Sequence, residues 1–462
     1  MSRSLIGDRQ FYKRVLAIAL PMILQNTVTN LVSLVDNLMV GQLATEQIAG
    51  VTIINNNLLF IFNLCFFGAA AGAGIFTTQY FGSGDHDGVR YTFRFKILCC
   101  LVLCAVGVGV FLVADDALIS LYLQGDGDPA VAEKTLFYAK QYLMWMLPGL
   151  LPFALTNAYA GTLKVCGQAT VPALASVAAT GVNIGLNWLL IFGNLGMPAM
   201  GIRGAALATV ISRFVEFGIV AVWSHRHSEQ LPFMKGLYRS LRIPGKLLRA
   251  IAIKGSPLLL NETMWSFGIA FLNQCYSFCA LDVVPALSIS STVFNMSSIC
   301  FKALGVTVGI VTGQMLGANK PEEEVRDTNR KLTALCMATG VVFAGLMAGS
   351  SGLFPKLYQT TDTVRSLATS FILIASTDVL FQSYIYPVYF TLRSGGKTVA
   401  TFLFDCGSIW LLSLPTAYIL SHFTSVPVLI IYGICTGLGL VKCIIGVFMI
   451  RSKTWMQNIT VR

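Results

Sequence analysis

The sequence predicts an all-α integral membrane protein with twelve transmembrane helices in two six-helix lobes. Three observations predict this fold: an apolar composition, a series of long apolar runs and an internal repeat. Of the 462 residues, 55% are hydrophobic and only 11% are charged, whereas soluble proteins carry about 25% charged residues. The mean hydropathy is +0.70. This composition excludes disordered proteins and soluble enzymes. Despite the net charge of +11, we expect no nucleic-acid partner.

Twelve apolar runs are long enough to cross a bilayer, which takes roughly 20 residues per helix. The predicted segments are residues 12–40, 47–79, 92–114, 134–158, 162–192, 202–223, 248–278, 283–315, 330–350, 364–390, 398–421 and 426–450. Prolines interrupt several of them, which membrane helices tolerate where neighbouring groups or a cavity satisfy the freed backbone. These prolines are Pro21, Pro148, Pro152, Pro172, Pro257, Pro387 and Pro415.

The basic residues predict that both termini are cytoplasmic, in a multi-pass protein of the cell membrane. The first apolar run continues past Asn30 to Val40, so we interpret it as a membrane helix rather than a cleaved signal peptide. With the N-terminus inside, 24 of the 32 Lys and Arg residues fall on the cytoplasmic side, from Arg3 to Arg462, as the positive-inside rule requires. The acidic residues of the largest outer loop are Asp115, Asp116, Asp126, Asp128 and Glu133.

The domain organisation follows from a basic polar stretch at residues 224–247, near the middle of the chain. We expect this stretch to be a cytoplasmic linker. It separates an N-lobe, residues 1–223 with helices 1–6, from a C-lobe, residues 248–462 with helices 7–12.

An internal repeat relates the two lobes. LPMILQN around Pro21 matches SPLLLNE around Pro257, and Asn26 then pairs with Glu262. Residues 77–94 match 311–330, residues 161–170 match 390–399, and the pair Gly204 and Arg213 matches Gly433 and Lys442. Each half holds an even number of helices, so the repeats are parallel. Transporters of this organisation bind substrate and coupling ions in a cleft between the lobes or within a lobe.

These motifs resemble the multidrug and toxic compound extrusion family, the MATE transporters. The resemblance covers nearly the whole chain. It rests on LVDNLMVGQL (34–43), TQYFGSGD (78–85) with GQMLGANK (313–320), the stretch 183–213, and TLRSGGKT (391–398). It implies two six-helix lobes that form a V-shaped cleft. It also implies export of organic cations and other toxic compounds in exchange for inward protons or sodium ions.

The first candidate site surrounds Asp36 on the first helix. A carboxylate at bilayer depth is costly, so it is a functional hypothesis by default; the alternative is a hydrogen bond between helices. Asn183 and Asn187 share one face of the fifth helix because they are four residues apart. The resemblance implies an aspartate at position 187 in the proton-coupled branch, and the asparagine here leaves a neutral amide cage that could hold a cation or water beside Asp36. Further polar lining candidates are Gln25, Asn26 and Asn30.

The second candidate site is in the C-lobe. Glu262 follows Pro257, which frees backbone carbonyls nearby, and Asp378 shares a helix face with Gln382. The resemblance implies that Glu262 and Asp378 take part in ion coupling. A carboxylate offers oxygen ligands to sodium when it is ionised and can instead carry a proton, so Glu262, Asp378 and Asp36 are candidate sites for either ion. Asp405 matches no position of the family pattern.

The cations at depth are Arg213, Lys302 and Lys442. Arg213 and Glu216 are three residues apart on one helix and could form a pair. Since Lys442 is the repeat equivalent of Arg213, we expect structural roles for both. Lys302 has no counterpart in the repeat and no assigned role.

The function that these features predict is secondary antiport of small organic cations, drugs or toxic compounds against H+ or Na+. The alternative is a lipid-linked glycan flippase of the same architecture, which would need more cations in its cavity than this chain provides. No HExxH, GxSxG or Walker motif is present, so we expect neither an enzyme nor an ATP-driven pump. We expect no cofactor beyond the coupling ion, a lipid environment and a monomer.

Overall fold

The computed structural model describes residues 5–123, 129–280, 282–358 and 360–460. The described residues form helices and no strand, and nine of their helices are long and apolar enough to cross a membrane. The predicted all-α membrane fold is therefore confirmed. Arg3, Asp126, Asp128 and Arg462, which were used to predict the topology, lie outside the described residues.

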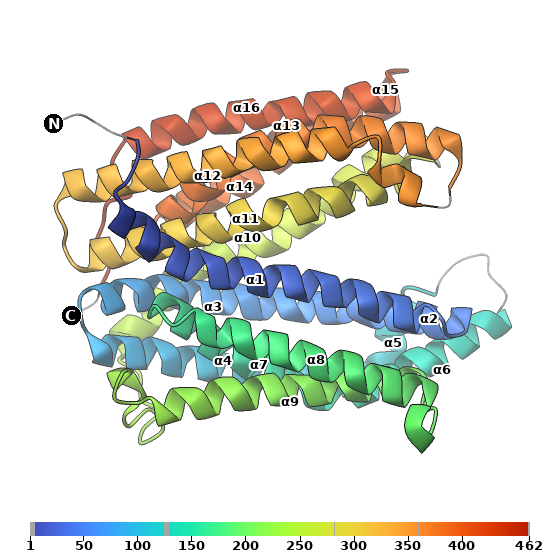
Figure 1. The fold of residues 1–462 in the computed structure, drawn as a ribbon, viewed down its shortest axis with the longest axis horizontal. Coiled ribbons are helices and arrows are strands. Elements are labelled where there is room, and N and C mark those ends of the chain that lie inside the picture. The colour runs from blue at the N-terminus through green and yellow to red at the C-terminus, as the bar shows by residue number, and fades with distance from the viewer. Residues whose placement is uncertain (1–4, 124–128, 281, 359, 461–462) are drawn as a thin grey trace. The chain divides into compact units, whose positions relative to one another are not determined.

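The six predicted N-lobe segments each coincide with a helix or an interrupted helix (Figure 1). The elements are α1 (Arg9–Val40), α2 (Thr45–Ile53), a π-helical stretch (Ile54–Leu58), α3 (Leu59–Gly82), α4 (His86–Val113), α5 (Asp115–Ser120), α6 (Pro129–Met146), α7 (Leu150–Val165), α8 (Thr170–Phe192) and α9 (Ile202–Arg226). The π-helical stretch joins α2 to α3, and the short α5 belongs to none of the predicted segments.

The six C-lobe segments coincide with helices in the same way. The elements are α10 (Gly245–Ser277), α11 (Val283–Gly317), α12 (Glu322–Ser350), α13 (Asp362–Ser394), α14 (Thr398–Ser408), a π-helical stretch (Ile409–Ser413), α15 (Leu414–Phe423) and α16 (Val428–Arg451).

Some of the prolines mark interruptions of the helices, since proline lacks the N–H that closes a helical turn. Pro148 lies in the 3-10 turn Leu147–Gly149 between α6 and α7. Pro415 is the second residue of α15, which begins directly after a π-helical stretch. By contrast, Pro21, Pro257 and Pro387 lie inside continuous helices.

One predicted boundary is wrong. The prediction ended the fourth segment at residue 158 and began the fifth at 162, but α7 continues to Val165 and α8 begins at Thr170. Gly167 takes a left-handed conformation with φ +79°, which glycine adopts without a Cβ penalty. The chain therefore turns at this glycine, and residues 162–165, Lys164 among them, belong to the preceding helix.

The chain divides into two compact units whose bounds differ slightly from the predicted lobes. One unit contains Met1–Ala19, Thr78–Asp85 and Arg249–Arg462, and the other contains Leu20–Thr77 and His86–Leu248. The end of α3 belongs to the unit of the C-terminal half because its backbone approaches α11. A Cβ at Gly82 would overlap the Gln314 carbonyl, and a Cβ at Gly317 would overlap the Gln79 carbonyl.

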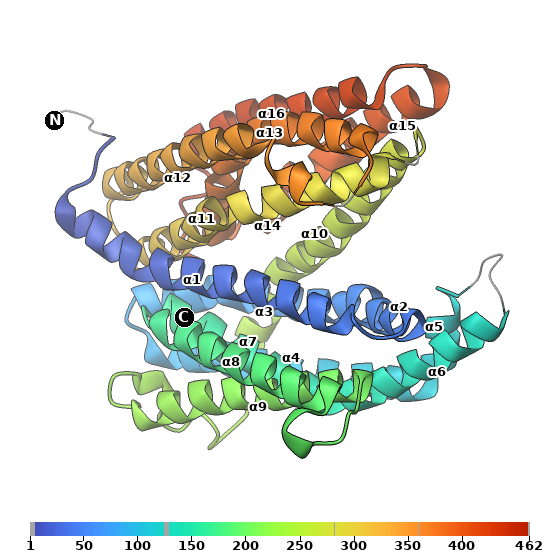
Figure 2. The same cartoon turned by 45° about the vertical axis from the view of Figure 1, so that its right-hand side comes forward.

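The unit of the C-terminal half is built around α13. This helix packs against α11, α12, α14 and α16, and the views in Figures 1 and 2 both show α12, α13 and α16 side by side. Its inward face is apolar, with Phe371, Ile372 and Val379 fully buried in the core.

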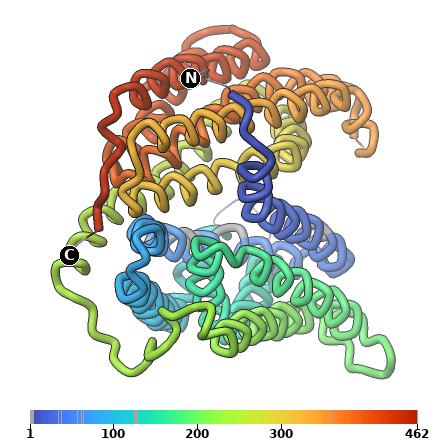
Figure 3. Tube along the Cα trace, turned by 60° about the vertical axis from the view of Figure 1, so that its left-hand side comes forward, coloured from blue at the N-terminus to red at the C-terminus, as the bar shows by residue number. Residues whose placement is uncertain are grey.

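In the other unit, α9 packs against α6, α7 and α8. The predicted linker is folded onto this unit and can be followed in Figure 3 as the yellow-green segment after α9. Its apolar residues Leu231, Phe233, Met234 and Leu237 are buried. The Arg94 guanidinium of α4 donates to the carbonyls of Leu237 and Gly236 at 2.8 Å each.

Candidate functional site

The first candidate site lies within the unit of the N-terminal half, where α1 meets α8. Asn187 Nδ2 donates to Asp36 Oδ1 at 2.6 Å, and it also lies 3.2 Å from the Asn183 amide. Asn183 and Asn187 are 5% and 2% exposed, so the two amides are almost fully buried, whereas Asp36 is half-buried. The structure therefore brings Asp36, Asn183 and Asn187 together. The spacing of four residues had predicted only that the two amides share one helix face.

The Asn183 amide lies beside the carboxylate and directs its Nδ2 at it. This Nδ2 donates to Asp36 Oδ1 at 2.8 Å and to Oδ2 at 3.2 Å. The other end of the amide lies 3.5 Å from Thr209 Oγ1 on α9. Sequence reasoning missed Thr209, although the repeated small and hydroxyl residues of α9 are the signal for a closely packed, polar helix face.

An acceptor oxygen in this site has no donor. Asn187 Oδ1 is buried and accepts no hydrogen bond from any described residue. A buried acceptor without a partner is costly. Carboxylate and amide oxygens are the ligands that hard cations prefer, and the same oxygens can hold a protonated carboxyl or water.

The other polar lining candidates of α1 differ in their surroundings. Asn26 and Asn30 are exposed, whereas Gln25 is half-buried. The Gln25 side-chain oxygen is buried and accepts no hydrogen bond from the described residues. Within the described residues, no hydrogen bond joins Gln25, Asn26 or Asn30 to Asp36.

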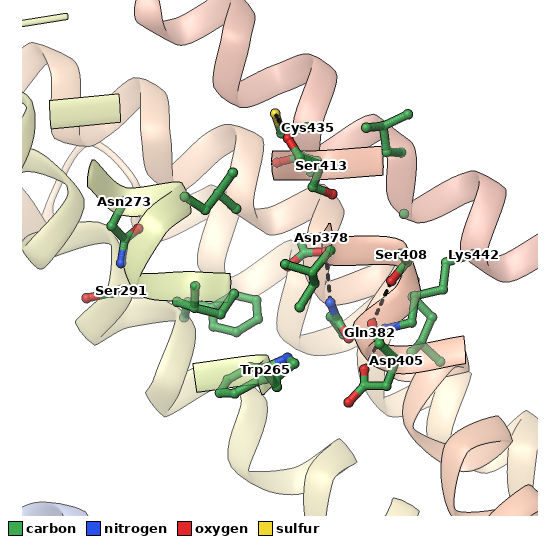
Figure 4. Close-up of a pocket in the computed structure, with 18 of the residues that line it drawn as sticks. Trp265, Asn273, Ser291, Asp378, Gln382, Asp405, Ser408, Ser413, Cys435 and Lys442 are labelled. Atoms are coloured by element: carbon green, nitrogen blue, oxygen red, sulfur yellow. Dashed lines mark hydrogen bonds and ion pairs between the residues drawn. The ribbon is translucent and has the colours of Figure 1, made fainter. Parts of the chain in front are cut away.

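The second candidate site is a cavity of about 840 Å³ within the unit of the C-terminal half, between α10, α11, α13, α14 and α16. Its lining includes Glu262, Asp378, Gln382 and Asp405. Figure 4 shows Asp378 and Gln382 close to one another, with Asp405 and Lys442 to one side. The cavity therefore contains both predicted C-lobe carboxylates and a third.

Glu262 and Asp378 have separate partners in this cavity. Asp378 Oδ1 accepts from Gln382 Nε2 at 3.3 Å, as their spacing of four residues on α13 permits. Glu262 Oε1 accepts from the Tyr389 hydroxyl at 3.4 Å. The described residues include no cluster of three His, Cys, Asp or Glu side chains able to hold a metal ion. A sodium ion here would therefore need hydroxyl, amide or backbone oxygens as further ligands.

Asp405 is the centre of a polar cluster that the sequence did not reveal. Lys442 Nζ binds Asp405 Oδ1 at 2.7 Å, and Asn261 Nδ2 donates to Asp405 Oδ2 at 3.0 Å. Asn261 is 1% exposed and also approaches the Tyr389 hydroxyl at 3.4 Å. The sequence does hold a sign that Asn261 belongs to a polar site. It lies directly before Glu262 in the repeated motif, and the matching position in the other half is the polar Gln25.

The sequence suggested that Arg213 could pair with Glu216, but among the described residues no ion pair joins them. The Arg213 guanidinium lies over the Phe153 ring at 4.8 Å from its centroid, and Nη1 approaches the Gly149 carbonyl at 3.4 Å. The partners of Arg213 are thus an aromatic face and a backbone carbonyl instead of the Glu216 carboxylate. Its repeat equivalent Lys442 also lies over a ring, that of Phe404 at 5.2 Å.

The fold, the repeat and the enclosed carboxylates define a multi-pass membrane transporter. The MatE family model matches residues 21–189 and 261–419, once in each half of the chain. The chain therefore belongs to the MATE family, and the resemblance noted in the sequence is confirmed.

Relatives and solved structures resemble the chain over most of its length. A probable multidrug resistance protein NorM of Thermotoga maritima is 24% identical and covers 89% of this chain and 86% of its own. A probable multidrug resistance protein YoeA of Bacillus subtilis is 26% identical, covering 88% and 87%. A structure described as an outward-facing multidrug resistance MATE family transporter shares 19% identity and covers 97% of both chains with a TM-score of 0.84.

Proposed function

We propose that this protein exports drugs and other small organic compounds, cations among them, in exchange for inward protons or sodium ions. The observation that carries this proposal is the cluster around Asp36, in which a half-buried carboxylate meets two buried amides. Among the described residues, no Lys or Arg forms an ion pair with this carboxylate. The names of the NorM and YoeA relatives support drug export over the flippase alternative.

The amides of Asn183 and Asn187 suit a site that binds and releases an ion. When Asp36 is charged and empty, the Nδ2 atoms of both side chains donate to its carboxylate and offset its charge. A proton or sodium ion that binds Asp36 neutralises the carboxylate and weakens these two hydrogen bonds. Asn187 Oδ1 is then an acceptor available to the bound ion. Occupancy of Asp36 thus changes the hydrogen bonds between α1 and α8.

The cellular setting belongs to the same proposal. The protein acts as a monomer in the cell membrane. Both of its termini are cytoplasmic, because the basic residues gather on the side that the positive-inside rule assigns to the cytoplasm. It needs no cofactor other than the coupling ion. The energy comes from the ion gradient, since the sequence has no Walker motif.

The test is transport by the purified protein in liposomes, with proton and sodium gradients imposed separately and ethidium as the fluorescent organic cation. We expect ethidium movement to require at least one gradient and no ATP. Asp36→Asn keeps the side-chain shape but loses the charge, so it should lower the gradient-driven rate at least about tenfold with little change in folding. Asp116→Asn is the matched control, because this carboxylate is exposed and pairs with Lys140.

Two results would contradict the proposal. One is ethidium transport that persists after both gradients have collapsed. The other is an Asp36→Asn protein that transports at the wild-type rate when present at equal density in the vesicles.

A further inference from the structure

The linker, residues 224–247, lies against α4 instead of projecting away from it. Arg90 Nε donates to the Phe233 carbonyl at 3.1 Å, and Arg94 Nε donates to the Leu237 carbonyl at 2.8 Å. Arg90 and Arg94 are about one turn apart on α4, and their acceptors are also four residues apart. The linker chain therefore advances along the first turns of α4 in the direction of the helix.

This path places the linker at the level of the lipid headgroups. The helix α4 has 28 residues and is long and apolar enough to cross a membrane. It is therefore about 42 Å long, whereas the hydrocarbon core of a bilayer is about 30 Å thick. The charged residues of α4 all lie in its N-terminal half, so the excess length is at that end. The turns that carry Arg90 and Arg94 thus lie in the interfacial layer, and the linker lies beside them.

A tyrosine contact fixes the next part of the linker at the same level. The Tyr238 hydroxyl is hydrogen-bonded to the hydroxyl of Tyr159. Tyr159 is 2% exposed and lies six residues before α7 ends at Val165. The Tyr238 ring itself is 55% exposed. Tyr238 therefore has its hydroxyl bound to the helices and its ring on the outside of the protein.

The exposed side of the linker combines cations with apolar side chains. We define the basic linker face as the exposed residues Lys235, Tyr238, Arg239, Leu241, Arg242 and Lys246. Within the part of the chain that the structure describes, the side chains of its four cations form no ion pair and no hydrogen bond. Glu229 is the only acidic residue in the linker sequence. The face therefore presents four positive charges that are available to a ligand.

We propose that the basic linker face binds anionic phospholipids of the adjacent leaflet, with their phosphates on its cations and their chains against Tyr238 and Leu241. Lys and Arg side chains bind phosphate by charge-assisted hydrogen bonds and attract anionic lipids at a membrane surface. Tyrosine rings favour the same layer. Leu241 is 48% exposed, and a free phosphate would leave it and Tyr238 in water, whereas a lipid covers them. This inference goes beyond the proposed export function and does not depend on it.

The first test compares phosphatidylglycerol, which is anionic, with zwitterionic phosphatidylcholine. Native mass spectrometry of the purified full-length protein, released from neutral detergent micelles, gives the dissociation constant of the first bound lipid. A Lys or Arg near an anionic surface contributes about fivefold in affinity. If one phosphate contacts two cations, phosphatidylglycerol should bind about 25-fold more tightly than phosphatidylcholine. The preference should decrease as the salt concentration rises.

A triple variant then locates the contact. Lys235→Gln/Arg239→Gln/Arg242→Gln should lower the preference to about fivefold or less, because only Lys246 remains. The matched control is Lys134→Gln/Arg203→Gln/Lys356→Gln, which also removes three exposed cations but none from the linker. The control should keep the wild-type preference. Size-exclusion elution verifies the folding of both variants.

Limited trypsin digestion tests the wild type in a bilayer, without any substitution. In nanodiscs of phosphatidylcholine, trypsin should cleave after Lys235, Arg239 and Arg242. Addition of phosphatidylglycerol should slow these cleavages at least about fivefold relative to cleavage after Lys134 in the same sample, because bound lipid covers the face.

Three results would overturn the proposal. The first is equal affinity of the wild type for the two lipids, and the second is a full preference for phosphatidylglycerol in the linker variant. The third is displacement of bound phosphatidylglycerol by soluble glycerol phosphate, which would assign the cations to a free phosphate compound. No measurement uses an ion gradient, so failure of ion-driven export would leave these results interpretable.

Discussion

Lys442 and Asp405 form the most enclosed ion pair described in the chain, with side chains 10% and 17% exposed. Breaking such a pair from one side strands a charge, whereas replacing both partners removes the problem. Lys442→Met should therefore destabilise the protein by about 3–5 kcal/mol. The double variant Lys442→Met/Asp405→Asn should recover most of that loss, because Asn261 can still bond to the new amide.

The measurement is thermal unfolding in detergent at fixed protein concentration. The control is Lys453→Met, whose partner Glu322 is 56% exposed, so its loss should cost less than about 1 kcal/mol. If the double variant is no more stable than Lys442→Met, the pair is not the reason for the loss.

The site residues show what sequence alone can predict at this scale. Asn183 and Asn187 were placed together because four residues bring side chains onto one helix face. The same local rule suggested that Arg213 binds Glu216, but the guanidinium lies over Phe153 instead. Spacing gives the neighbours that a helix permits, whereas contacts between helices decide among them. Asp405 and Lys442 are 37 residues apart, so no local rule could pair them.

At the scale of helices, two glycines related by the repeat allow a close crossing. Gly82 lies against the Gln314 carbonyl and Gly317 against the Gln79 carbonyl, with no room for a Cβ at either position. Gly82→Ala and Gly317→Ala should each destabilise the protein by about 1–3 kcal/mol, because the helix backbones must separate.

Gly345→Ala is the matched control. Gly345 is inside α12 and has no atom within 4 Å of an added Cβ, so alanine should stabilise it by about 0.5–1 kcal/mol. Thermal unfolding of the three variants measures the contrast. Equal effects at Gly82 and Gly345 would show that the crossing is not tight.

The linker gives a second prediction for an element. Arg94 is 6% exposed and donates to the carbonyls of Gly236 and Leu237. Arg94→Met keeps an apolar stem but loses these charge-assisted bonds, each worth about 1.5–3 kcal/mol. Local opening of the linker should become at least about tenfold more frequent.

Limited trypsin digestion measures this opening, with cleavage after Lys235, Arg239 or Arg242 identified by mass spectrometry. Arg203→Met, an exposed arginine outside the linker, should digest at the wild-type rate. Unchanged digestion of Arg94→Met would mean that the buried apolar residues of the linker hold it without the arginine.

Helices were easier to predict than their ends or connections. Apolar runs fixed all twelve segments, because any spanning chain must satisfy its backbone within the segment. The boundary near Gly167 was misplaced although Lys164 and Gln168 flank this glycine, because apolar residues before and after them left the end of the helix unmarked. The linker was predicted as a polar connection, yet Phe233 and Met234 are buried. Their apolar side chains were visible in the sequence, but the surface that covers them was not.

For the whole molecule, the two halves keep one helix order but hold different polar sites. Asp36 corresponds to no carboxylate in the second half, and Glu262 corresponds to Asn26 in the first. The Asp36 cluster and the cavity of Glu262 and Asp378 lie in different compact units. The repeat therefore preserves the scaffold, while the two halves are free to carry separate steps of transport.

The last prediction separates the two sites by a double-mutant cycle on ion binding, measured as the thermal stabilisation produced by sodium or by a change of pH. Asp36→Asn and Asp378→Asn should be additive within about 0.3–0.5 kcal/mol, as expected for independent sites that share no ligand. Glu262 and Asp378 line one cavity. The double variant Glu262→Gln/Asp378→Asn should therefore lose less ion-induced stabilisation than the sum of the two single variants. Because the readout is binding, variants that no longer transport remain measurable. Strict additivity of Glu262 and Asp378 would mean that they do not share a cation, and strong coupling between Asp36 and Asp378 would mean that both units respond to the same ion.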